Sequence, residues 1–352
     1  MGLLDPVREM LKTRKRRKTR DAIHAALTRA WERAETTELV YGERVVIFSD
    51  HHKGARDGAD DFQRCERTYN AALAYYNKRG YHLVELGDVE ELWENTFKEV
   101  VAEYAHTLEL AADFQQGAGY TRIYGNHDIA WKDGDLFRSK MGDRYKDVDP
   151  IESLRITVKD AAGEPVVELF LVHGHQGTAS SDRFAFFSKL FVRFGWRRLQ
   201  RLINRPWNTP SVDWALRGEH AADMEHWAAD NNRVLIAGHT HMPVFFQSSK
   251  QPAAPLADPA AGAVDQEALG LARAEWAAAE LARLARNPPI APTTPCYFNT
   301  GCCSFGDGDI TGLEIADGEI RLIRWPCVPA TAPRLLAPMT LVDVERAAGT
   351  LD

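Results

Sequence analysis

Hydrophobic residues occur in short runs along the chain, and several runs end abruptly at a polar residue. The clearest run covers residues 43–49, where β-branched and apolar residues lead directly to Asp50. Its length and composition predict a buried strand. Similar runs predict two further strands with helices between them: strands at 81–86 and 120–124, helices at 60–79 and 97–114. This alternation is typical of an α/β layered fold.

The pattern changes beyond residue 150. Residues 154–158 and 166–172 predict two strands joined by a turn at 161–163, and residues 233–237 predict another strand. Short strands are expected again near the C-terminus, at 296–301, 310–316 and 319–325. The chain is therefore expected to be an α/β protein with additional segments around a layered core.

Shifts in composition predict the domain organisation. Residues 7–35 are expected to form a helix whose first half is strongly basic, and the residues after Pro326 are expected to form a tail. The predicted units are an N-terminal basic helix (1–40), a main domain (41–326) with an aromatic and basic helical insertion (178–230) and an Ala/Pro-rich insertion (250–292), and a C-terminal tail (327–352).

The bulk composition is that of an ordinary globular protein. The 352 residues are 45% hydrophobic and 26% charged, and the net charge of −7 disfavours general nucleic-acid binding. Five cysteines form no CxxC pair, and the N-terminus lacks a secretory signal, so a reducing, cytoplasmic setting is expected. No run reaches the roughly 20 apolar residues that a membrane span requires.

The polar residues at the predicted strand ends are rich in metal-binding types. Five blocks stand there in order: Asp50-x-His52, Gly87-Asp88, Gly125-Asn126-His127-Asp128, His173 and Gly238-His239-x-His241. Each block alone has an ordinary explanation as a turn or a cap, but five in succession predict a shared site. Oxygen and nitrogen ligands without thiolate suit Mn, Fe or Zn. Two such ions about 3.5–4 Å apart would hold a phosphoryl group for in-line displacement.

This set of blocks resembles the calcineurin-like metallophosphoesterase superfamily, whose pattern is D-x-H, G-D, G-N-H-D/E, H and G-H-x-H. The resemblance spans residues 50–241 and implies a four-layer α/β/β/α sandwich of two mixed sheets. It also implies a dinuclear site with two divalent metal ions. Asp50, His52 and His241 would hold one metal; Asn126, His173 and His239 would hold the other; Asp88 would bridge the two.

The resemblance further implies an enzyme that hydrolyses a phosphate ester or pyrophosphate bond by attack of a metal-bridging hydroxide. His127 would protonate the leaving group, and Asp128 would orient its ring. Asn126 would also contact substrate, and His175 is a candidate for a substrate contact. His51 is not expected to be a ligand, because it should point away from Asp50 and His52.

The segment Gly87–Trp93 resembles the G-D-x-x-E-x-W block of the UDP-2,3-diacylglucosamine pyrophosphatase branch. The chain departs from that branch at His175, where the branch has Asp, and at His127, where its well-known members have Arg. The open alternatives are therefore a phosphomonoesterase, a phosphodiesterase, a pyrophosphatase acting on a nucleotide-linked lipid, or a nuclease. A non-catalytic scaffold is the least favoured alternative.

Two basic segments are candidates for binding an anionic partner. Most residues in the segment 12–20 are lysine or arginine. In the second segment, basic residues recur every four positions at Lys189, Arg193, Arg197, Arg201 and Arg205. Each segment is either a solvated helix face or a contact for an anionic membrane surface or polynucleotide. A peripheral position on the inner face of a membrane is the expectation, with manganese as the favoured metal. The sequence does not indicate an oligomeric state.

Overall fold

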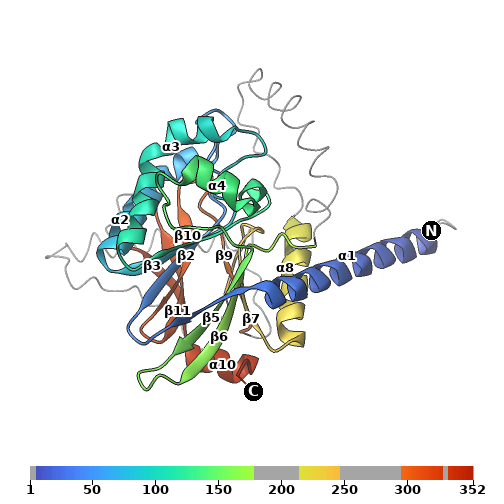
Figure 1. The fold of residues 1–352 in the computed structure, drawn as a ribbon. Helices are drawn as coiled ribbons and strands as arrows, with labels where there is room; N and C mark the ends of the chain where they lie inside the picture. The colour runs from blue at the N-terminus through green and yellow to red at the C-terminus, as the bar shows by residue number, and fades with distance from the viewer. Residues whose placement is uncertain (1–4, 178–213, 246–294, 328–331, 352) are drawn as a thin grey trace, which may run out of the picture.

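The computed structural model describes residues 5–177, 214–245, 295–327 and 332–351, and these residues build two six-stranded sheets with helices on their outer sides (Figure 1). The four-layer architecture implied by the metallophosphoesterase resemblance is therefore confirmed. No helix among the described residues combines the length and apolarity needed to cross a bilayer.

The first sheet contains the strands that precede Asp50, Asp88 and Asn126. Its order is β12-β11-β10-β2-β3-β4, and β2, β3 and β4 run parallel to one another. The strands are β2 (Arg44–Phe48), β3 (Tyr81–Leu86), β4 (Tyr120–Ile123), β10 (Ile310–Ala316), β11 (Glu319–Trp325) and β12 (Arg334–Thr340). The last three pair antiparallel and extend the sheet beyond β2.

The second sheet contains the strands that precede His173 and His239. Its order is β1-β5-β6-β7-β9-β8, with β6, β7 and β9 parallel to one another. The strands are β1 (Glu35–Leu39), β5 (Ser153–Lys159), β6 (Pro165–Val172), β7 (Val234–Ala237), β8 (Pro243–Val244) and β9 (Tyr297–Thr300). The parallel strands of both sheets direct their carboxyl ends toward one region of the molecule.

Helices cover the outer face of each sheet (Figure 1). Helices α2 (Glu66–Lys78), α3 (Phe97–Ala112) and α4 (Gly134–Met141), with short 3-10 turns at Phe62–Arg64, Asp113–Gln116 and Ile129–Lys132, lie on the side of the first sheet. Helices α1 (Asp5–Arg33), α8 (Trp214–Asp230) and α10 (Leu341–Ala348) contribute side chains to the core around the second sheet.

Strand β2 shows why the sequence runs are almost continuously apolar. Val45 and Ile47 belong to the core between the sheets, whereas Val46 and Phe48 belong to the core under α2 and α3. Because successive side chains of a strand point to opposite faces, a strand buried on both faces has no polar positions. In β2 the polar residues Ser49 and Asp50 therefore begin only where the strand ends.

Two boundaries differ from the sequence-based expectation. Residues after Pro326 do not form a separate tail: β12 is an edge strand of the first sheet, and Leu341 and Val344 of α10 are buried in the core. Residues 35–39 are not part of the N-terminal helix but pair with β5 as strand β1. Strands β1 and β12 lack a regular alternation of hydrophobic and polar residues, and their place in a sheet depends on neighbours distant in sequence.

Two other expectations lie largely outside the described residues. The Ala/Pro-rich insertion at 250–292 and the basic stripe between Lys189 and Arg205 are not described. Of the insertion predicted at 178–230, the structure describes its last part as helix α8.

Candidate metal centre

The first group of candidate ligands comes from both sheets. Asp50 and His52 follow β2, and His241 follows β7. One ligand atom from each of the three lies within 4.8 Å of the others. The Nε2 atom of His241 is 3.2 Å from Asp50 Oδ1 and 3.1 Å from His52 Nε2. The predicted first metal group is therefore assembled in space.

The second group lies beside the first. Asp88, His173 and His239 also have ligand atoms within 4.8 Å of one another, and Asp88 Oδ2 is 3.1 Å from His173 Nε2. The same Asp88 oxygen is 3.9 Å from His52 Nε2, in the first group. Asp88 thus reaches both groups, which is the position that a bridging carboxylate needs.

The chemistry of these donors fits a pair of divalent cations. His52 and His241 point ring nitrogens at each other, an arrangement that a shared cation would explain. Among the described residues, the buried Asn126 Oδ1 has no hydrogen-bond partner. Buried polar atoms are nearly always satisfied, so a buried amide oxygen without a hydrogen-bond partner fits a cation ligand.

Neighbouring groups orient the ligands. His173 Nδ1 donates to the Leu86 carbonyl at 2.8 Å, which leaves Nε2 to face Asp88. Asp50 accepts from the His239 backbone N–H at 2.9 Å and from the Ser49 hydroxyl, which also contacts Thr300. Burial raises the pKa of Asp50, but His241 and His173 outweigh it, so its pKa lies well below the usual range. The carboxylate is therefore held ionised, as a metal ligand must be.

The backbone at five predicted ligands is unusual. Positive φ angles occur at Asp50 (54°), His52 (53°), Asp88 (51°), His239 (66°) and His241 (56°). Residues other than glycine rarely adopt this left-handed conformation, and such strain concentrates at functional sites. The strand-end turns therefore hold their ligand side chains at a cost in local stability that the surrounding fold must offset.

Gly87 has two reasons to be glycine. Its φ is +85°, and a Cβ there would collide with the His173 ring. Gly163 also has φ +85°, but a Cβ at that position would have no atom within 4 Å. A substitution at Gly163 therefore measures the cost of the left-handed backbone without a steric clash. We expect Gly163→Ala to lower the free energy of unfolding by about 1–2 kcal/mol. Gly87→Ala should lower the free energy of unfolding by about 3 kcal/mol or more, because the clash with His173 adds to the cost of the left-handed backbone.

Urea denaturation of both variants tests this prediction, with bound metal measured in parallel. Only Gly87→Ala should lose metal, since only its Cβ displaces a ligand ring. Equal losses of stability in the two variants would contradict the close packing of Gly87 against His173.

His127 stands next to the first metal group, and Glu91 orients it. Its Nδ1 is 2.5 Å from Glu91 Oε2, and the same carboxylate is 3.2 Å from His52 Nδ1. Trp93 stacks on the His127 ring with centroids 4.0 Å apart. Burial lowers the pKa of His127, but the charges of Glu91 and Asp88 outweigh it and raise that pKa to about 9. The His127 ring is therefore protonated, and its Nδ1 proton is shared with Glu91.

The expectation that Asp128 orients His127 needs correction. The Asp128 carboxylate accepts from the backbone N–H groups of Gly125 and Val89, at 2.6 and 3.0 Å, and pairs with Arg122 at 3.1 Å. It therefore supports the loops, while Glu91 contacts the ring. Glu91 is recognisable in the sequence as the acid of the G-D-x-x-E block, but nothing there indicates which histidine it meets.

His175 is buried beside the second group, with its ring centroid 5.5 Å from that of His173. Burial, with a contribution from His173, lowers the pKa of His175 to about 3, so it is neutral. Two residues of α8 also reach the site without having been predicted. His220 donates from Nε2 to the Gly174 carbonyl at 2.7 Å, and Arg217 donates to the Thr240 carbonyl at 3.2 Å. Only the packing of α8 against the strand ends could reveal them.

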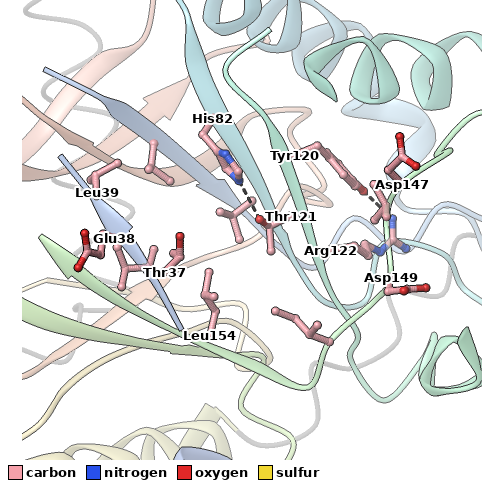
Figure 2. Close-up of a pocket in the computed structure, with 15 residues that line it drawn as sticks. Thr37, Glu38, Leu39, His82, Tyr120, Thr121, Arg122, Asp147, Asp149 and Leu154 are labelled. Atoms are coloured by element: carbon pink, nitrogen blue, oxygen red, sulfur yellow. Dashed lines mark hydrogen bonds between the residues drawn. The ribbon is translucent and has the colours of Figure 1, made fainter. Parts of the chain in front are cut away.

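A separate cavity of about 250 Å³ lies toward the other ends of β2 and β3 (Figure 2). Its walls include Leu39, Val45 and Leu154, and one of its polar side chains, His82, is paired with Thr121 at 2.8 Å. None of the candidate metal ligands lines it. The cavity is therefore distinct from the metal centre.

Comparison with known proteins gives no matching family model and no matching curated protein. Solved structures do match. A dimetal phosphatase from Danio rerio is 8% identical over 86% of this chain and 99% of its own, with a TM-score of 0.38. Vacuolar Protein Sorting 29 from Cryptosporidium parvum is 11% identical over 85% and 99%, with a TM-score of 0.34. A predicted phosphoesterase from Streptococcus pneumoniae is 12% identical over 85% and 97%, with a TM-score of 0.31. Similarity at this level carries no functional argument, which depends on the residues described above.

Proposed function

We propose that this protein is a phosphoesterase that uses two divalent metal ions. One observation supports the proposal most: two ligand groups, each drawn from both sheets, lie on either side of Asp88, and His127 stands beside them. Asp50, His52 and His241 would hold one ion, and Asn126, His173 and His239 the other. The bound ions would activate water as a nucleophile and neutralise the phosphoryl oxygens.

The side chains supply proton transfer. Glu91 accepts the Nδ1 proton of His127, so the Nε2 proton is the one available for the leaving oxygen. Glu91 also contacts His52, and so ties the proton donor to the first metal group. Trp93 covers one face of the His127 ring and restricts its rotation.

Manganese is the metal we favour, because the donor set contains only carboxylate, amide and imidazole groups. Iron and zinc share these ligands. For the substrate, we favour a phosphodiester or pyrophosphate over a monoester, on the basis of the Gly87–Trp93 block. A nucleotide-linked lipid is the specific form that the resemblance to the pyrophosphatase branch supports.

The direct test is hydrolysis of bis-p-nitrophenyl phosphate and p-nitrophenyl phosphate by metal-free protein supplied with Mn²⁺, Fe²⁺ or Zn²⁺. We expect turnover that depends on metal and a stoichiometry near two ions per chain. Two bound ions without turnover on these esters, UDP-linked lipids or nucleic acids would favour a non-catalytic scaffold. Cleavage of DNA or RNA would instead support the nuclease alternative.

We further propose that α1 contacts an anionic membrane surface on its cytoplasmic side. Arg16 faces inward and pairs with Asp223 of α8, whereas Arg14, Arg17 and Lys18 are exposed and lie three and four residues apart. Figure 1 shows the N-terminal half of α1 projecting past α8. The exposed cations therefore form one face that the fold leaves open.

Reversing these three charges to glutamate is expected to weaken binding to vesicles containing phosphatidylserine by about 100-fold or more, at about 1 kcal/mol per cation. Cosedimentation at two salt concentrations measures the change. Reversal of three exposed lysines elsewhere, Lys132, Lys140 and Lys146, alters net charge equally and serves as the control. Equal weakening in both variants, or preference for RNA over vesicles, would contradict membrane docking by α1.

A further inference from the structure

A buried network of charged side chains lies directly behind the candidate metal centre. Its five members are fully buried: Lys53, Glu85, Glu90, Arg122 and Asp128. They come from β3, β4 and the loops that follow β2, β3 and β4, which also carry ligands. Burying charges is costly unless each is paired, and apolar residues would often serve stability as well. Stability alone therefore does not explain why these positions are charged.

Arg122 is the centre of this network. One arm of its guanidinium donates to Glu85 at 2.9 Å. The other arm donates to Asp128 at 3.1 Å and also contacts Glu90. Lys53 holds the opposite oxygen of Glu85 at 3.1 Å. A single planar group thus joins carboxylates from β3, from the loop after β3 and from the loop after β4.

Asp128 carries this connection to the ligand loops. Its two oxygens accept from Gly125 N at 2.6 Å and from Val89 N at 3.0 Å. Gly125 immediately precedes Asn126, and Val89 immediately follows Asp88. Each accepted proton therefore belongs to a residue adjacent to a predicted ligand.

Backbone hydrogen bonds connect the network to the loop after β2 and to His127. His52 N donates to the Asp88 carbonyl at 2.9 Å, and Leu92 N donates to the His127 carbonyl at 3.2 Å. His127 N in turn donates to Asp88 Oδ1 at 2.8 Å. A shift of Asp128 would consequently move Asp88, Asn126 and His127 relative to one another.

We propose that Arg122 is a positioning residue for the metal centre, acting through Asp128 on the loops that carry Asp88 and Asn126. Metal centres depend on such supporting groups: their loss typically costs 10–100-fold in metal affinity or activity. The part of the inference that concerns turnover rests on the proposed phosphoesterase function. The part that concerns metal affinity does not.

Arg122→Lys is the informative variant. Lysine keeps the positive charge but has one ammonium head in place of the planar fork, so it cannot hold Glu85 and Asp128 together in the same geometry. We expect Mn²⁺ affinity, measured by calorimetry on metal-free protein, to fall by about 10–100-fold. In the same variant kcat should fall by a similar factor while KM changes by less than about threefold, because the network does not reach the substrate.

Arg324→Lys is the matched control. Arg324 is also nearly buried and forms an ion pair with Asp309, but it lies on β11, away from the ligand loops. Thermal unfolding of both variants reports any general loss of stability. The inference is supported if Arg122→Lys weakens Mn²⁺ binding far more than Arg324→Lys does, at comparable loss of stability. Equal Mn²⁺ affinity in the two variants would overturn it.

Asp128→Asn keeps the experiment decisive if Arg122→Lys does not fold. Asparagine has the same size but cannot accept all three donated protons. The expected result is again weaker Mn²⁺ binding with an unchanged fold by circular dichroism; unchanged Mn²⁺ affinity would overturn the inference. If wild-type protein binds two ions but hydrolyses no ester, the proposed function fails, whereas the affinity comparison still decides the role of Arg122.

Discussion

Asp88→Asn is expected to abolish the dinuclear site and lower kcat by about a thousandfold or more. Asp88 Oδ2 faces both ligand groups while Oδ1 accepts from His127 N, and a neutral amide cannot supply the negative charge that two cations would share. Loss of one metal removes several kcal/mol of transition-state stabilisation, and each 1.36 kcal/mol corresponds to about tenfold in rate. Metal analysis should show fewer than two ions per chain, and activity on bis-p-nitrophenyl phosphate should be lost in parallel.

Asp317→Asn provides a control matched in both chemistry and backbone. Asp317 has a φ of 55°, close to the 51° of Asp88, but lies in the exposed turn between β10 and β11. Its substitution should leave metal content and kcat unchanged. If Asp88→Asn retained two ions and full activity, the assignment of Asp88 as the bridging ligand would be wrong.

His127→Asn is expected to lower kcat strongly while both metals remain bound. His127 lies beside the ligand groups, and its Nδ1 contacts Glu91, so it is placed to transfer a proton. A general acid contributes about 10²–10⁴-fold. The loss should be large for esters with poor leaving groups, such as phenyl phosphates, and much smaller for p-nitrophenyl esters, whose leaving group needs little protonation.

The dependence on the leaving group separates proton donation from general damage to the site. Glu91→Gln should show the same trend with a smaller loss, because the ring would keep a hydrogen-bonding partner without a charge. His82→Asn, at a histidine lining the cavity remote from the metals, should leave kcat unchanged. An equal loss for every leaving group would indicate that His127 acts on metal binding or folding instead.

The strand ends explain how much of the site is predictable. β2, β6 and β7 are largely apolar, and β3 and β4 are rich in residues that favour strands, so their positions follow from the sequence pattern. Parallel strands collect their carboxyl ends at one edge, so residues such as Asp50 and Asp88 can be placed together from the sequence alone. Strand order alone does not predict which loop side chain meets which partner.

The assignment of Asp128 illustrates that limit. Asp128 is next to His127 in sequence and is expected from that proximity to hold its ring, yet the turn directs its carboxylate to Gly125 N, Val89 N and Arg122. Glu91, on the preceding ligand loop, reaches His127 instead. Sequence proximity is a poor guide here because adjacent residues on a tight turn point in different directions.

The hydrophobic pattern of the sequence also does not predict where edge strands and helices pack. Strand β12 has no regular hydrophobic alternation. Leu341, Val344 and Ala348 of α10 recur at helical spacing, but which surface they pack against is decided only in three dimensions. His220 and Arg217 of α8 reach the candidate site for the same reason: α8 packs against the second sheet and brings them to the strand ends.

The sequence by itself determined the layered α/β class, because hydrophobic periodicity is a local property. The resemblance of its motif blocks also indicated Asp50, His52, Asp88, His173, His239 and His241, which the structure brings together. The tertiary structure alone decided that Glu91 orients His127, that Arg122 lies at the centre of a buried frame behind the ligands, and that five ligands adopt left-handed backbone. These features depend on how loops from separate strands approach one another, and that approach is set by sheet order and packing rather than by neighbours in the chain.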